Sequence, residues 1–97
     1  MAYHKKMNLV HRKTDRVAVA ELKVWKVQSS EYPEGIKYSM FLTALDSGEI
    51  IIGMDNHDPK GPHLHRRGCE VSYDSDISTD SLVDNFWKLA KEEGFEP

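Results

Sequence analysis

Short extended runs of apolar residues constrain the fold of this chain more than any other feature. Apolar and polar side chains alternate over residues 36–45, and residues 49–54 contain three consecutive isoleucines, which is typical of a strand covered on both faces. Residues 7–13 and 17–27 also favour strands, and two phase slips within 17–27 predict a bulge or a strong twist. Residues 46–48 (Asp-Ser-Gly) predict a hairpin turn between two of these runs.

The periodicity changes from strand to helix near the C-terminus. Leu82, Phe86 and Ala90 recur at a spacing of four residues and define the apolar stripe of an amphipathic helix. Ser78 is suited to cap the first amide groups of this helix, and Gly94 is suited to end it in the left-handed conformation. The sequence therefore predicts one C-terminal helix after a series of strands.

These elements predict a single α+β domain over residues 1–97. With a last short strand over residues 70–73, we expect an antiparallel twisted sheet of four to five strands with the C-terminal helix packed on one face. No run approaches the roughly 20 apolar residues of a membrane span, and no secretory signal is evident. The single cysteine, Cys69, excludes an internal disulfide. We therefore expect a cytoplasmic protein without a membrane partner.

Charge is distributed unevenly along the chain. Residues 1–27 contain seven lysines or arginines and two acidic residues, whereas the remaining 70 residues contain six and fourteen. The basic part favours an approach to phosphate groups, and the acidic part favours a basic partner or simply solubility.

Residues 56–68 form the segment that core packing does not explain. It contains three histidines, three basic residues, two prolines and two glycines, so we expect an irregular loop at the end of a buried strand. Imidazoles can act as acid and base in RNA cleavage because their pKa is about 6.5, and nearby cations can stabilise charge on the phosphorus. The candidates for these roles are His57, His63 and His65 as acid and base, with Lys60, Arg66 and Arg67 as cations.

Two other interpretations of this loop remain open. His63 and His65 are two residues apart, so an extended backbone places both on one side, where His57 with Asp55 or Asp58 can complete a metal site. The neighbouring cations oppose that assignment. Alternatively the loop is purely structural or a recognition surface, with Asp55 and Asn56 bonding to its amides.

A set of short motifs resembles the TumE-like family of toxins from prokaryotic toxin–antitoxin pairs. The motifs are Glu21–Val27, Lys37-Tyr38-Ser39, Asp55-Asn56, Lys60-Gly61 and His63-Leu64-His65, within a similarity that extends from Val17 to Gly94. The resemblance implies a toxin component whose partner is a helix-turn-helix antitoxin. It also carries over, as the family motif, the residues Asp55, Asn56, Lys60, Gly61, His63 and His65.

The residues and the resemblance together predict a toxin that cleaves RNA by histidine acid–base catalysis. The predicted catalytic residues are His63, His65, Lys60, His57 and Asp55. The predicted substrate-binding residues are Asn56, Gly61, Arg66 and Arg67. No metal ion or other cofactor is predicted, and the expected partners are an antitoxin, RNA and a second copy of the chain. The alternatives are a non-catalytic protein-binding module, a metal-binding protein built on the same loop, and a nucleotidyl-transferring toxin, which the lack of a glycine-rich phosphate loop disfavours.

Overall fold

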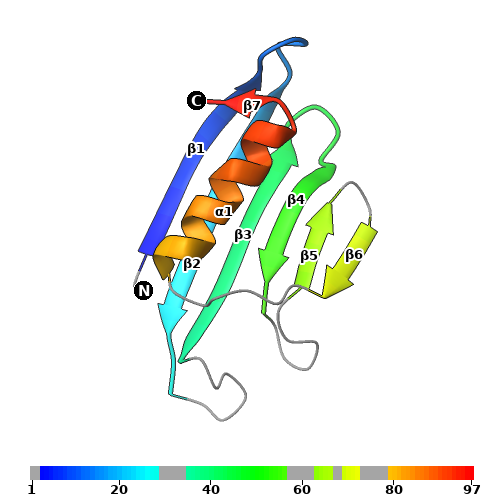
Figure 1. The fold of residues 1–97 in the computed structure, drawn as a ribbon. Coiled ribbons are helices and arrows are strands. Elements are labelled where there is room, and N and C mark those ends of the chain that lie inside the picture. Colours follow the sequence, from blue (N-terminus) through cyan, green and yellow to red (C-terminus); the bar gives the residue numbers. More distant parts are fainter. Residues whose placement is uncertain (1–2, 29–34, 57–62, 67–68, 73–78) are drawn as a thin grey trace.

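The computed structural model describes residues 3–28, 35–56, 63–66, 69–72 and 79–97 (Figure 1). Its strands form one antiparallel sheet in the order β6-β5-β4-β3-β2-β1-β7, and the single helix α1 lies across one face of it (Figure 1). The elements are β1 (Tyr3–His11), β2 (Val17–Lys26), β3 (Ile36–Ala44), β4 (Ile50–Asp55), β5 (His63–Arg66), β6 (Cys69–Ser72), α1 (Thr79–Glu92) and β7 (Phe95–Glu96).

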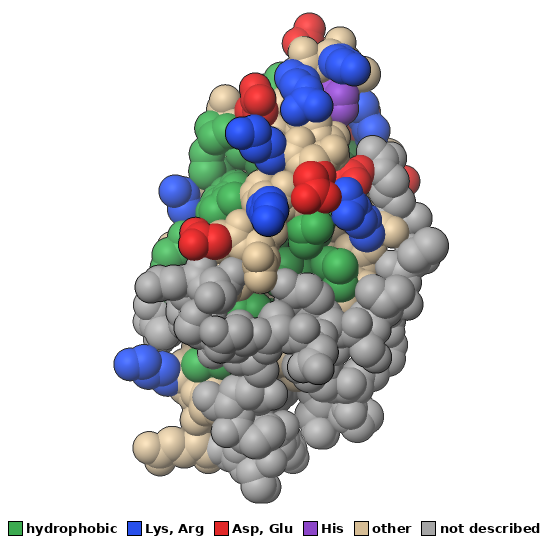
Figure 2. All heavy atoms as spheres, in the orientation of Figure 1, with side chains coloured by type: hydrophobic (Ala, Val, Ile, Leu, Met, Phe, Trp, Pro, Cys, Tyr) green, Lys and Arg blue, Asp and Glu red, His purple; other side chains and the backbone are tan. Residues whose placement is uncertain are grey.

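The hydrophobic core lies between the sheet and α1. Every second residue of β2 and β3 is fully buried, as strand alternation requires when one face is covered. The helix contributes the stripe that its periodicity predicts: Leu82, Phe86 and Ala90 are buried, and Trp87 packs against them at the rim. Charged side chains of both signs lie on the surface over α1 (Figure 2). Among the described helices, α1 with its 14 residues is too short and too polar to cross a membrane.

The structure confirms the α+β class and the C-terminal helix but contains more strands than the four to five predicted. One additional strand, β5, lies within residues 56–68, where an irregular loop was expected. The other, β7, is only two residues long and follows Gly94, whose φ of 90° ends the helix in the left-handed conformation. Short strands with polar or charged sequences carry little periodicity, so the sequence pattern misses them.

Of the bulge or strong twist predicted for residues 17–27, the bulge is absent from β2. β2 pairs with β1 and β3 without any shift, because Ala18 and Ala20 continue the buried phase of Leu22 and Val24. The described register shift lies instead between β3 and β4, at Leu42 and Thr43. The central, doubly covered position predicted for the isoleucine run is confirmed, since β4 lies between β3 and β5 and is buried from Ile51 onward.

Candidate functional site: a polar band on the outer sheet face

The sheet face opposite α1, called the outer face below, carries two adjacent rows of residues, most of which are polar. Strand pairing defines both rows, because paired residues lie side by side across the sheet. We call these rows the polar band. The first row contains His4, Lys23, Ser39, Asp55 and His63, and the second contains Lys6, Glu21, Phe41, Gly53 and His65.

Gly53 lies at the centre of the second row, between Phe41 and His65. A Cβ atom at Gly53 would lie 2.5 Å from Cε1 of Phe41 and 3.4 Å from Cβ of His65. The Phe41 ring therefore covers the glycine, and His65 begins directly beside it. Glycine is required here because a larger side chain would clash with Phe41, and not because the backbone adopts an unusual angle. His65 itself is half-buried.

Asn56 ends β4 by bonding to the backbone of β3. Its Oδ1 accepts a hydrogen bond from the N–H of Tyr38, and its Nδ2 donates to the carbonyl of Ile36, both at 2.9 Å. The side chain is 3% exposed and thus extends the strand ladder by one pair of bonds. Both polar groups of this predicted substrate-binding residue are therefore engaged with β3. The preceding residue, Asp55, is also buried, at 5% exposure.

The lysine of the first row is a residue that sequence reasoning did not assign. Lys23 is part-exposed, pairs with Ser39, and has its Nζ 3.9 Å from Oε1 of Glu21. The other carboxylate oxygen of Glu21 lies 3.1 Å from Nε2 of His4, and this hydrogen bond lowers the pKa of Glu21 below its ordinary value. The polar positions of β2 are visible in the sequence, but only the register shows that Lys23 shares a row with Asp55.

Arg66 does not join the polar band. Its Nε donates to Oε2 of Glu93 at 2.8 Å, and its Nη2 donates to Oε1 of Glu92 at 3.2 Å. The hydrogen bond with Glu93 also raises the pKa of the guanidinium. Adjacent residues of a strand face opposite sides, so Arg66 ties β5 to the end of α1 while His65 belongs to the outer face. Proximity in sequence therefore did not bring this cation to the histidine.

The structure places only some of the remaining predicted site residues. His57, Lys60, Gly61 and Arg67 lie outside the described residues, as does the predicted helix cap at position 78. For His63 the pairing of β5 gives a position opposite Asp55. Within the described segments, no group of three or more His, Cys, Asp or Glu residues is arranged to hold a metal ion.

The similarity of the sequence to known proteins decides the family. Residues 3–93 match a family model described as Toxin TumE. The chain belongs to the TumE toxin family. The resemblance seen in the sequence motifs is thereby confirmed, and membership in the TumE family implies an antitoxin partner. No curated protein and no solved structure matches the chain.

Proposed function

We propose that this TumE-family toxin cleaves RNA by acid–base catalysis at the polar band. The main support is the register, which aligns Ser39, Asp55 and His63 across three neighbouring strands, with His65 in the adjacent row. The hydrophobic core lies on the opposite face of the sheet, so packing does not account for this set of residue types.

The proposed reaction uses two imidazoles. The neutral one removes the proton of a ribose 2′-hydroxyl, whose oxygen attacks the adjacent phosphorus. The bond from phosphorus to the 5′-oxygen breaks, and the protonated imidazole gives its proton to that leaving oxygen. The products are a 2′,3′-cyclic phosphate and a 5′-hydroxyl. His63 and His65 take these roles in the proposal, because an imidazole side chain can serve as either the acid or the base.

Other residues bind and orient in this proposal. Asp55, opposite His63, orients an imidazole, and Asn56 holds the end of β4 in place. Lys23 lies three strand spacings from β5, about 14 Å, so it binds a flanking phosphate rather than the scissile one. Lys60 and Gly61 of the family motif, together with Arg67 and His57 from the same stretch of sequence, are assigned to the scissile phosphate in this proposal.

The decisive experiment replaces His65 and compares it with a matched histidine. His65→Ala should reduce cleavage of RNA by the purified toxin about 100-fold or more, the usual contribution of one acid or base. His4→Ala, at the far end of the polar band, should leave kcat unchanged, because β1 lies four strand spacings, about 19 Å, from β5. Full activity and full growth arrest with folded His65→Ala would overturn the proposal.

Two further measurements separate the chemistries. Cleavage that persists in EDTA supports the metal-free route, whereas activity lost in EDTA and restored by one added metal ion supports the metal site considered from the sequence. Lys23→Ala should raise KM and leave kcat nearly unchanged.

We also propose, from the family resemblance, that the antitoxin is a helix-turn-helix protein and that the pair acts in the cytoplasm.

A further inference from the structure

The edge of β1 that faces away from β2 is paired with another strand along only part of its length. β7 pairs with Val10 and His11 alone, and no described strand pairs with the outer side of residues 3–9. The amide of His11 donates to Arg16 in the hairpin with β2, whereas the amide of Arg12 donates to the carbonyl of Gly94 on the β7 side. Backbone N–H and C=O groups alternate between the two sides of a strand. Those of His4, Lys6 and Asn8 therefore point away from β2, toward the open edge. This half of β1 is a strand edge that can accept another strand.

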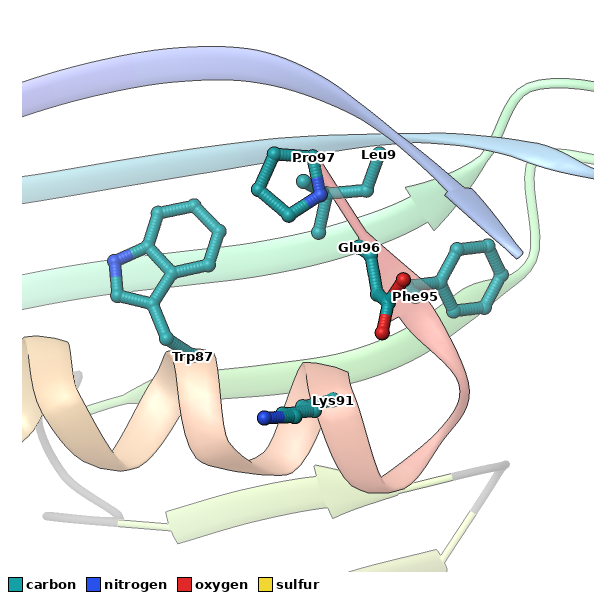
Figure 3. Close-up of a pocket in the computed structure, with 6 residues that line it drawn as sticks. All are labelled: Leu9, Trp87, Lys91, Phe95, Glu96 and Pro97. Carbon is teal, nitrogen blue, oxygen red and sulfur yellow. The ribbon is translucent and has the colours of Figure 1, made fainter. Parts of the chain in front are cut away.

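A hollow of about 420 Å³ lies beside this edge, where β7 ends (Figure 3). Leu9 and Trp87 give it an apolar wall, and Lys91 and Glu96 stand at its border. Because Glu96 pairs with Val10 and Pro97 follows it, a strand that continues the line of β7 along β1 begins beside Pro97 and Leu9, two of the residues that line this hollow. An apolar side chain on such a strand has a place to bury.

The surroundings of the edge are basic. Residues 1–14 contain no aspartate or glutamate, and Lys5 and Lys6 give β1 one lysine on each side of the sheet. Nζ of Lys5 lies 5.8 Å from the centre of the Trp87 ring, at the border of the hollow. An acidic strand complements this edge.

We propose that the antitoxin binds this toxin by adding an extended acidic segment to the edge of β1, with one large apolar side chain in the hollow beside Trp87. Backbone bonds to His4, Lys6 and Asn8 provide affinity, and the hollow and the lysines select the segment, as in other cases of strand addition. This inference rests on the antitoxin partner implied by the family and not on RNA cleavage, so either proposal can fail without the other.

The test uses the antitoxin encoded next to the toxin gene and measures its affinity for purified toxin variants by calorimetry. Asn8→Pro removes an outward N–H at a position where an edge strand tolerates proline, and Asn8→Ala is the matched control that keeps it. We expect Asn8→Pro to weaken binding about tenfold or more and Asn8→Ala to leave it nearly unchanged. Equal affinities of the two folded variants overturn the proposal.

The two tryptophans provide a second, independent comparison. Trp87 borders the hollow, whereas Trp25 belongs to the outer face and has Nζ of Lys37 at a similar 5.7 Å from its ring. Trp87→Ala should weaken antitoxin binding and Trp25→Ala should not, with thermal unfolding as the check of fold. Similar losses for both variants, or a loss only for Trp25→Ala, contradict the assignment.

Hydrogen exchange gives a readout that needs no substitution. The amides of His4, Lys6 and Asn8 should become protected when the antitoxin is added to wild-type toxin. Protection of these amides in toxin alone that increases with its concentration shows a second copy of the chain on the edge and overturns the proposal. Protection by RNA instead of antitoxin overturns it as well.

Discussion

Asn56 allows the sharpest test of how the structure supports the candidate site. In Asn56→Ala, the N–H of the buried Tyr38 and the carbonyl of the part-buried Ile36 lose the hydrogen bonds that the Asn56 side chain makes with them. A buried backbone group without a partner costs about 1–3 kcal/mol. Two such groups, one of them partly accessible to water at the strand end, should lower the free energy of unfolding by about 2–4 kcal/mol. Typical domains have a total stability of only about 5–15 kcal/mol.

The assay is thermal and urea unfolding of the purified protein. For a domain of this size, about 1 kcal/mol shifts Tm by roughly 4–8 °C, so Asn56→Ala should lower Tm by at least about 8 °C. Asn8→Ala is the control, because this asparagine is exposed and the change should stay within about 0.5 kcal/mol. If Asn56→Ala is as stable as wild type but loses RNA cleavage, Asn56 contacts substrate and the structural role argued above is refuted.

Two further changes test the sheet and its charges. Gly53→Ala should destabilise the fold by about 1–3 kcal/mol because its Cβ meets the Phe41 ring, and the added substitution Phe41→Ala should make Gly53→Ala nearly neutral in urea unfolding. At the β2–β3 end, the hydrogen bond from Arg16 lowers the pKa of Asp46 below its ordinary value of 3.8, so the ionised carboxylate stabilises the fold above that pH. The small difference in Tm between wild type and Asp46→Asn should therefore be present at neutral pH and disappear as the pH falls below about 4; a difference that grows in acid would contradict this linkage.

The sequence determined most of the fold through its periodicities. The isoleucine run of β4 buries its side chains as a strand, and the apolar residues of α1 bury theirs as a helix. Each pattern has one favourable conformation, so the local sequence and the final structure agree. Gly94 likewise ended the helix where its backbone freedom predicts. The family motif could also be recognised from the sequence, because it depends on the order of residues and not on distances between them in the structure. The strand count failed where elements were short or polar and carried little pattern.

Only the tertiary structure decided which residues of the site share a face. Strand alternation sends His65 to the outer face and Arg66 to α1, although they are adjacent in sequence, because neighbouring side chains of a strand point in opposite directions. The same geometry brings Lys23 into the row of Asp55 from 32 positions away, through pairings that span three strands. Such neighbours depend on register, and register is fixed by burying one whole face of the sheet beneath the helix, which no local stretch of the chain can determine alone.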